Sequence, residues 1–575
     1  MAKLSSFSRA QNMWFVTCLL LLIFRSSWAQ SPVEPALEIQ RQELRERILR
    51  KGLEPSPDVS IPRVAVPVIS DIIPENESPC LTISHITLAG DSAEHFQFAL
   101  SAAIEGDDPA IDRCLGIKGI NTTLTRIQNT IIAKGYITTR VLVTPQNLKT
   151  GELKFTVIPG RIHTIKFADD ASPRGRYWNA LPANPGDLLN LRDVEQALEN
   201  FKRVPTADAD IQIEPASALN ARPGESDIVI NYSQSVPFRI TLSANDSGSR
   251  STGKNQGSAT LSGDNLLTLN DLFYYSINHD LGNGGEGQNG TSGYTLHYSL
   301  PIDYWLLGIT SSQYDYHQAV AGANQTFIYS GESSNAELKL SRLIYRDAVR
   351  KTTVSLLTYL KSSRNFIDET EIEVQRRRMA GWQANVSHKE FIAAATLDID
   401  LAYRQGTGMF DALEAPEEPF GEGTARPKII TANLGLALPF KFGTQQFRYN
   451  STLRAQWNKT PLVPQDRFAI GGRHTVRGFD GELTLSAERG WLFRNDLGLI
   501  LGNSGQELYL GLDYGHVSGP TAELLLGHHL AGGVVGLRGG YKGLYWDLFV
   551  GGPINKPKGF KPSTGVSGFS VSWTY

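Results

Sequence analysis

From about Pro237 to Tyr575, apolar and polar side chains alternate along the chain with a period of two. Residues 447–457 carry mostly apolar side chains at odd positions and polar ones at even positions, and residues 397–404 repeat the alternation. This pattern is typical of β-strands with one apolar and one polar face. The stretches run near ten residues, which suits tilted strands that cross a membrane. A soluble β-sandwich is the alternative, and the length of the region favours a closed barrel of about 16 antiparallel strands.

A second apolar pattern marks the N-terminus. Lys3 and Arg9 precede an apolar run at residues 13–24, and small residues stand at the −3 and −1 positions of the cleavage site that follows. The run is too short for a membrane helix, so residues 1–29 are predicted to be a secretory signal peptide. Lipidation at Cys18 is the alternative, but the residue before it is unsuitable and the apolar run continues past it.

A polar helix and a proline-rich linker are predicted next. The helix falls within residues 30–52 and carries a thin apolar stripe of Leu37, Leu44 and Ile48. Such a stripe is too narrow for a normal core, so a solvated extension is one interpretation. Residues 53–79 are rich in proline. At about 3.1 Å per residue in polyproline conformation this linker would reach roughly 80 Å, farther than the thickness of a bilayer core, about 30 Å.

Two compact modules are predicted between the linker and the barrel, at residues 80–159 and 160–234. Both combine strand and helix patterns, which is typical of small α+β domains. The first is expected to contain strands at 83–88, 136–143 and 153–157 and helices at 91–104 and 122–134. The second is expected to contain strands at 162–167 and 227–232 and helices near 188–201.

Removal of the signal peptide would leave two cysteines, Cys80 and Cys114. An even pair in an exported chain predicts a disulfide. Closing a loop of roughly 35 residues would stabilise the fold by about 3–4 kcal/mol in the chain-entropy model. Two free, buried thiols are the alternative interpretation.

Composition and motif content favour neither nucleic-acid binding nor catalysis. The 55 basic and 58 acidic residues leave a net charge of −3, without the basic footprint that nucleic acid requires. The 11 histidines show no metal-ligand spacing. The glycine-rich segment 282–293 lacks the flanking strand and helix of a phosphate-binding loop, and we interpret it as an extracellular loop. We therefore expect no enzyme activity, no metal and no cofactor.

One short motif and one later strand predict a specific contact. Their positions are Val476, Arg477, Gly478 and Phe479 in the motif, and Gly511, Asp513 and Gly515 in the strand. The even positions of that strand, 508–514, are apolar, so Asp513 lies on its polar face. A loop arginine and an inward-facing aspartate predict a latch between Arg477 and Asp513 inside the barrel. A solvated pair of this kind would contribute only about 0–1 kcal/mol to stability.

The V-R-G-F motif, the G-x-D-x-G strand and the order of modules together resemble the TpsB transporters of two-partner secretion. This family is the haemolysin-activator branch of the outer-membrane assembly factor superfamily, and residues 135–141 are similar to its first POTRA module. The resemblance covers essentially the whole mature chain. It implies a plug helix at 30–52, POTRA domains at 80–159 and 160–234, and a transmembrane barrel at 235–575. It also implies that Arg477 lies on a loop folded into the lumen and pairs with Asp513.

The resemblance further implies a partner and a location. The partner is one large TpsA-type exoprotein, bound in the periplasm by the POTRA domains and secreted through a monomeric barrel in outer-membrane lipid. The mixed-charge plug helix, with Arg41, Arg45 and Arg47, suits a wet lumen. The cysteine pair resembles that of transporters for haemolysins and contact-dependent toxins. The terminal face of Phe569, Val571, Trp573 and Tyr575 resembles the signal read by the barrel assembly machinery, whose usual last residue is Phe.

Two alternatives remain at this stage. An assembly factor that inserts other proteins into the outer membrane would share the barrel and the motif, but usually has more POTRA modules and no plug helix. A porin-like ion channel would share the barrel, but the periplasmic modules argue against that as the main role.

Overall fold

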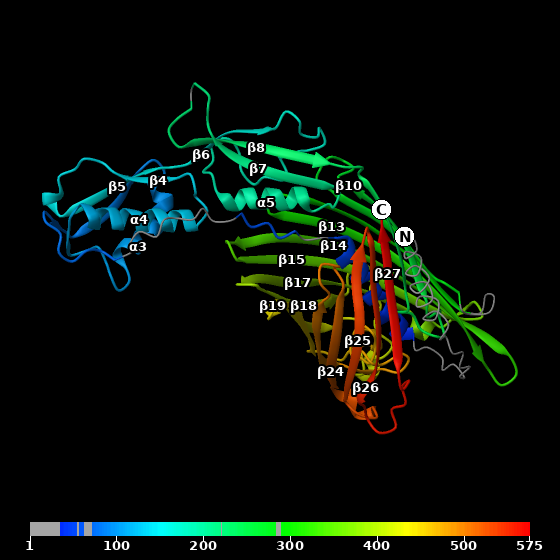
Figure 1. The fold of residues 1–575 in the computed structure, drawn as a ribbon. Coiled ribbons are helices and arrows are strands. Elements are labelled where there is room, and N and C mark those ends of the chain that lie inside the picture. The colour runs from blue at the N-terminus through cyan, green and yellow to red at the C-terminus, as the bar shows by residue number, and fades with distance from the viewer. Residues whose placement is uncertain (1–34, 55–56, 62–71, 220, 283–288) are drawn as a thin grey trace, which may run out of the picture.

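The computed structural model describes residues 35–54, 57–61, 72–219, 221–282 and 289–575. The predicted signal peptide, 1–29, lies outside these residues. Figure 1 shows a barrel of long strands, two α/β modules that follow one another away from one end of it, and a helix inside the barrel. Of the helices described, none is both long and apolar enough to cross a membrane.

Sixteen antiparallel strands form the closed wall of the barrel, as the sequence predicted. The wall strands are β9 (Phe238–Asn245), β10 (Gln256–Asp264), β11 (Leu272–Asp280), β12 (Gly290–Ile302), β13 (Trp305–Ala321), β14 (Thr326–Arg346), β15 (Arg350–Ile367), β17 (Arg377–Ile392), β18 (Ala395–Thr407), β19 (Lys428–Phe442), β20 (Gln445–Asn458), β23 (Arg489–Ile500), β24 (Glu507–Ser518), β25 (His529–Tyr541), β26 (Leu544–Asn555) and β27 (Val566–Thr574). The two-residue β16 (Thr370–Glu371) pairs only with the end of β15.

The expected strand length of near ten residues was wrong for part of the wall. β13, β14 and β15 have 17, 21 and 18 residues, because their ladder of hydrogen bonds continues beyond the length that a bilayer requires. In Figure 1 these strands extend into a long hairpin at the end of the barrel away from the modules.

The two faces of the wall differ in polarity. On β10 and β11, Leu261 and Ile277 point outward and are half exposed, whereas Thr260 and Ser276 are buried and share a hydrogen bond of 2.8 Å. A transmembrane barrel with a polar interior has this alternation.

Pairing of the last strand with the first closes the barrel. Five residue pairs join β27 to β9, among them Val571 with Ala244 and Trp573 with Leu242. The Tyr575 amide donates to the Ile240 carbonyl at 2.9 Å, and the Ile240 amide donates back. Trp573 and Tyr575 are exposed on the outside, while Phe569 is partly buried.

Two three-stranded sheets form the cores of the modules, in the orders β2-β5-β4 and β6-β8-β7. The first module contains β1 (Leu81–Ile83), β2 (His85–Gly90), the 3-10 helix η1 (Ala93–Leu100), α3 (Ser101–Ile104), β3 (Arg113–Leu115), α4 (Ile117–Ala133), β4 (Arg140–Val143), η2 (Leu148–Thr150) and β5 (Glu152–Ile158). The second contains β6 (Arg161–Phe167), α5 (Leu191–Lys202), β7 (Ala207–Pro215) and β8 (Glu225–Gln234).

Some predicted elements of the modules were wrong in type or extent. The helix expected at 91–104 is mostly the 3-10 helix η1, and α4 begins five residues earlier than predicted. β7 was missed, although its alternating burial is that of a half-buried strand. The helices expected near 188–201 are the single helix α5.

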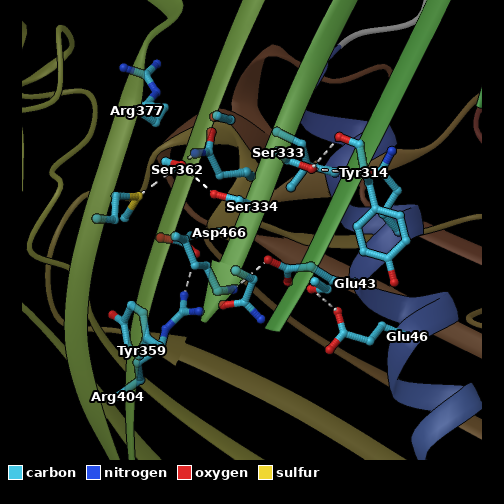
Figure 2. Close-up of a pocket in the computed structure, with 18 residues that line it drawn as sticks. Glu43, Glu46, Tyr314, Ser333, Ser334, Tyr359, Ser362, Arg377, Arg404 and Asp466 are labelled. Atoms are coloured by element: carbon cyan, nitrogen blue, oxygen red, sulfur yellow. Dashed lines mark hydrogen bonds and ion pairs between the residues drawn. The ribbon is translucent and has the colours of Figure 1, made fainter. Parts of the chain in front are cut away.

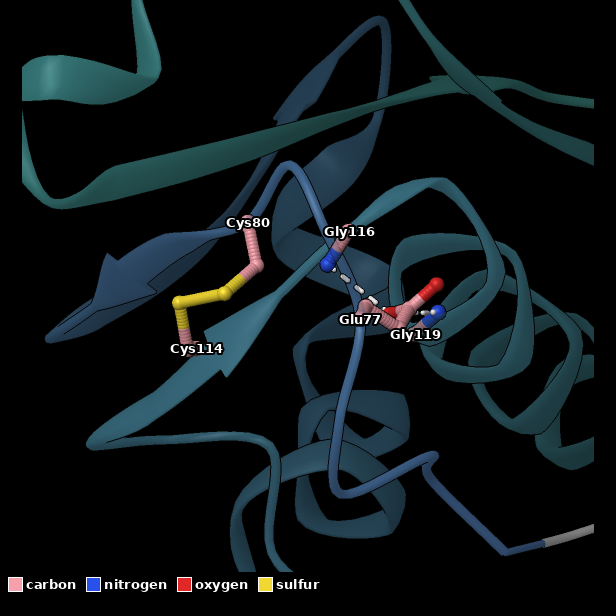
Figure 3. The surroundings of a disulfide bond; sticks show 5 residues. All are labelled: Glu77, Cys80, Cys114, Gly116 and Gly119. Carbon is pink, nitrogen blue, oxygen red and sulfur yellow. Dashed lines mark hydrogen bonds between the residues drawn. A yellow bond between two sulfur atoms is a disulfide. The ribbon is translucent and has the colours of Figure 1, made fainter.

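A carboxylate distant in sequence explains where α4 begins. Glu77 accepts hydrogen bonds of 2.8 Å from the amides of Gly116, Lys118 and Gly119, which the start of a helix leaves without partners. Desolvation raises the pKa of Glu77, but the three amides outweigh it and hold the pKa below its ordinary value. Figure 3 shows this cap beside the Cys80–Cys114 disulfide.

The disulfide predicted from the cysteine count is confirmed. Cys80 and Cys114 are bonded, with their Cα atoms 5.2 Å apart. Cys114 lies on β3, where it is the register partner of Thr82 on β1. The bond therefore joins the segment that enters the module to the strand before α4.

Helix α5 attaches the second module to the rim of the barrel. The side-chain amide of Asn200 donates to the backbone carbonyls of Ala180 and Asp303 at 2.8 Å, and the Tyr304 hydroxyl donates to the Asp193 carboxylate. Burial raises the pKa of Asp193 to about 6, against the lowering effect of the Tyr304 hydroxyl. Residues 303 and 304 form the turn between β12 and β13, so this end of the barrel faces the modules.

We predict that a Cys80→Ser, Cys114→Ser variant loses stability only in the first module. The bond closes a loop with a sequence separation of 34 residues, so its loss should lower the free energy of unfolding of that module by about 3–4 kcal/mol. Pulse proteolysis of the full-length protein in urea measures this transition. The heat-resistant migration of the barrel on gels should stay unchanged, and an unchanged first transition would contradict the prediction.

Candidate functional site

Residues 459–488, between β20 and β23, form a lumen loop that folds back into the barrel. A small hairpin of β21 (Phe468–Ile470) and β22 (Leu485–Ala487) shapes it. Val476 and Phe479 are buried in an apolar cluster with both hairpin strands and with the wall residues Leu492, Val517 and Leu530. The loop therefore has its own packed core inside a polar lumen.

Arg477 makes the most buried of the charged contacts between this loop and the wall, which also include Arg473 with Asp246 and Asp466 with Arg404. The Nη2 and Nε atoms of Arg477 lie 2.7 Å from the two carboxylate oxygens of Asp513 on β24, and its backbone amide donates to the same carboxylate at 2.9 Å. Asp496 on β23 lies 2.6 Å from Nη2. Charge-assisted, bidentate bonds of this kind fix both position and orientation.

The expectation that this pair is solvated was wrong. Arg477 and Asp513 are each only 4% exposed, because the loop covers them. Loss of one partner from a buried pair leaves an uncompensated charge and costs about 3–5 kcal/mol, far more than an exposed pair contributes.

The glycines of both motifs make room for this contact. A Cβ atom on Gly511 would lie 2.8 Å from Arg477 Nη2, and one on Gly515 would lie 2.8 Å from Val476 Cγ2. Gly478 has a φ of +93°, and a Cβ there would lie 2.4 Å from the Gly552 carbonyl oxygen. The spacing G-x-D-x-G thus places the aspartate between two positions at which the loop touches the strand.

Two participants in this contact could not be predicted from the sequence. A Cβ on Gly532 would lie 1.7 Å from the Arg477 carbonyl oxygen, so β25 must also carry glycine at the contact. Asp496 was missed as the second carboxylate on Arg477. The only sequence signal for Asp496 was its polar, inward position on a wall strand.

The plug helix α2 (Pro35–Leu53) fills part of the lumen. Its buried residues include Glu38, Gln42 and Glu46, one polar residue per turn, whereas Ile48 is 45% exposed. The expected apolar stripe is therefore not the buried face. The surrounding wall is polar, so the face that packs against it is polar too.

Each buried polar residue of α2 meets a partner. Glu38 lies 3.0 Å from Arg45 and accepts from Thr252, in the turn between β9 and β10, at 3.2 Å. Ser333 donates to Gln42 at 3.0 Å, and Ser312 donates to Glu46 at 2.9 Å.

The plug helix also touches the lumen loop directly. Arg41 donates to the Gly481 carbonyl, and Gln40 donates to the Pro464 carbonyl at 3.1 Å. Of the three predicted plug arginines, Arg41 contacts the loop, Arg45 pairs with Glu38 within the helix, and Arg47 is exposed. Plug and loop are thus one connected assembly.

A polar cavity of about 50 Å³ separates α2 from the wall strands β13 to β18. Figure 2 shows Glu43 and Glu46 of the helix on one side, and Arg404 directed at Asp466 with Tyr359 beside it on the other. Lys361 pairs with Glu43 across the gap. A polar cavity of this size suits a few ordered waters.

Together these features define a class of protein: a plugged outer-membrane barrel with an inward loop and POTRA-type modules at one end. Comparison with known proteins identifies the family. Residues 224–539 match the family model of haemolysin secretion/activation proteins ShlB/FhaC/HecB. Residues 81–160 match a ShlB-type POTRA domain, and residues 161–215 match another POTRA domain. The chain belongs to this family.

Relatives match over nearly the full length. The chain is 34% identical to the outer membrane transporter CdiB-2 of Burkholderia pseudomallei (strain 1026b), over 97% of this chain and 98% of the relative. It is 26% identical to the hemolysin transporter protein ShlB of Serratia marcescens, over 71% of both chains. The solved structure of CdiB from Acinetobacter baumannii is 29% identical, with a TM-score of 0.82 over 95% of this chain and 100% of that one.

The chain is therefore an outer-membrane transporter of two-partner secretion, with its POTRA modules in the periplasm. The alternative of a general assembly factor is not favoured.

We predict that Arg477→Ala releases the lumen loop without unfolding the barrel. Asp513 and Asp496 would lose their shared cation and keep only Arg494 at 3.7 Å and Arg538 at 3.1 Å, so the docked loop should lose up to about 3–5 kcal/mol. Thermolysin cleavage within residues 459–488 should rise at least about tenfold, while heat-resistant migration persists. Arg426→Ala, which removes an exposed arginine just before β19, is the control. Equal cleavage of the two variants would contradict the prediction that Arg477 holds the loop in place.

We predict that Glu38→Ala loosens the plug. The change removes the partner of Arg45 and of Thr252, so the open probability of the channel in planar bilayers should rise about tenfold or more. Arg47→Ala, on the exposed side of the same helix, should leave the open probability unchanged. If both variants behave alike, the polar face does not hold the plug.

Proposed function

We propose that this transporter secretes one large exoprotein of the haemolysin or contact-dependent toxin class. The observation that carries the proposal is the plugged lumen: a polar helix and a latched loop lie inside a closed barrel whose inner face is polar. A gate of this kind is useful in a pore that must pass a chain and otherwise stay closed. The match to transporters along the whole length supports the same conclusion.

The proposed division of labour follows the domain boundaries predicted from the sequence. The POTRA domains at 80–159 and 160–234 receive the unfolded exoprotein, the plug helix at 30–52 closes the pore, the linker at 53–79 tethers it, and the barrel at 235–575 spans the membrane. Folding outside the cell drives export. The protein acts as a monomer in outer-membrane lipid, without enzyme activity, metal, cofactor or nucleic acid.

Strand addition to a sheet edge is the proposed mode of docking on the POTRA domains. Part of the β4 edge of the first sheet is unavailable, because the side-chain amide of Gln128 occupies it. This side chain donates to the Thr139 carbonyl and accepts from the Val141 backbone amide, both at 2.8 Å. The Thr139 carbonyl and the Val141 amide are the backbone groups at the start of β4, the edge strand of this sheet. An incoming strand must therefore pair elsewhere.

Assembly of the barrel itself is proposed to use the last strand. Phe569, Val571, Trp573 and Tyr575 form the segment that closes the wall against β9, and we propose that the barrel assembly machinery recognises it. This role requires that the strand be free before closure.

Comparison of culture supernatants and outer-membrane proteomes with and without the gene tests the function. We expect loss of one very large secreted protein, with other barrels unchanged. Complementation with the wild-type gene should restore it, whereas the Asp513→Ala gene should give a heat-resistant barrel that secretes at less than about a tenth of the wild-type level. Depletion of many outer-membrane proteins would instead indicate an assembly factor.

A further inference from the structure

Linker residues 57–61 lie extended between helix α5 and the rim of the barrel. The Val59 amide donates to Glu199 and the Ile61 amide donates to Glu195, both at 2.9 Å. Arg346, at the end of β14, donates to the Val59 carbonyl. In Figure 1 this blue segment passes between α5 and strands β13 and β14.

Backbone groups of the linker make its contacts with α5 and Arg346, while two of its side chains also contact the rim: Asp58 pairs with Lys351 at 2.7 Å and Lys389 at 2.8 Å, and the Ser60 hydroxyl donates to the Ala348 carbonyl at 3.3 Å. Val59 and Ile61 are partly buried against the apolar core cluster of the second POTRA module, while Ser60 between them is exposed. The site thus recognises two amides and one carbonyl of an extended backbone, with apolar side chains at alternate positions. An added β-strand offers the same groups to a sheet edge.

The recognising groups hold one another in place independently of the linker. Arg346 lies 3.1 Å from Glu195 and 3.0 Å from Glu199, and Lys351 on β15 also pairs with Glu199. The side chains of Arg346 and Glu195 are 3% and 1% exposed. The charges are therefore compensated, and the acceptors are already oriented towards an extended chain.

We propose that this cleft of Glu195, Glu199 and Arg346 binds an extended, unfolded segment of the exoprotein, and that the linker is its resting occupant. The proposal rests on the function proposed above. The cleft stands at the periplasmic mouth of the barrel, where a chain enters the lumen. The cleft binds backbone groups. It can therefore bind successive segments of the exoprotein as the chain passes through, although their side chains differ.

Occupancy of the cleft is coupled to the plug. The plug helix ends at Leu53, and Glu54 accepts a hydrogen bond of 3.0 Å from Tyr274 on the wall. Only a few residues separate this contact from Val59. An exoprotein segment that displaces the linker therefore releases the end of the plug, and by reciprocity a docked plug weakens binding of the segment.

Binding of a peptide in trans tests the cleft. The protein variant is Val59→Pro, Ile61→Pro, which removes both donated amides. The probe is a fluorescent, end-blocked peptide with the sequence of residues 55–64. We expect it to bind the variant at least about tenfold more tightly than wild type. A peptide with Val59 and Ile61 exchanged should bind equally, and one with proline at both positions should not bind.

Channel recordings test the coupling. Open probability should rise about tenfold in the Val59→Pro, Ile61→Pro variant, and in wild type on saturation with the first peptide from the periplasmic side. Ser60→Pro is the matched control, because its amide lies between the two that are bound. If the proline pair fails to assemble a heat-resistant barrel, Ile61→Pro alone, which removes one of the two donated amides, replaces it.

The outcomes separate this proposal from the proposed function. Both assays work without the exoprotein. Failure of the peptide to bind the variant, or equal binding of the double-proline peptide, overturns the cleft whether or not secretion is normal. Loss of secretion on gene deletion supports the transporter even if the cleft is wrong.

Discussion

A barrel of sixteen strands encloses a polar lumen, and the need to satisfy the polar groups of that lumen determines the rest of the structure. An apolar plug would leave inward hydroxyls and charges without partners, at a cost of about 1–3 kcal/mol for each buried group. The helix that fills the lumen therefore turns Glu38, Gln42 and Glu46 to the wall. Water can replace the wall as the hydrogen-bond partner of these side chains. The plug can therefore bind the wall specifically and still leave it.

The lumen loop also lies inside this polar lumen, but it contacts the wall in a different way. It carries an apolar core around Val476 and Phe479, and its charged contacts with the wall are Arg477 with two carboxylates, Arg473 with Asp246 and Asp466 with Arg404. The core makes the loop a rigid body, and Arg477 fixes where that body sits. Because Arg41 of the plug donates to Gly481 of the loop, movement of one alters the support of the other. Plug, loop and linker form a chain of contacts from the far end of the lumen to the POTRA domains.

The strand period predicted the barrel well because membrane strands must alternate, and the strand count followed from length alone. The Arg477–Asp513 contact could be predicted for a related reason: the period fixed the face of Asp513, and the resemblance supplied the loop. Burial of that contact could not be predicted, because it depends on how the loop packs above it. The same holds for α4, whose start is set by Glu77, some forty residues earlier in the chain.

The sequence by itself thus determined the order of modules, the polar and apolar faces of the barrel strands, the cysteine pair and the family to which the chain belongs. These features are local or periodic in the sequence, so they can be recognised from the residue types within one stretch of the chain. Only the tertiary structure decided which face of the plug is buried, which carboxylates meet Arg477 and where the linker lies. Those features depend on the partners that a closed wall brings together, and the partners are hundreds of residues apart: Ser312 and Glu46, or Arg346 and Val59.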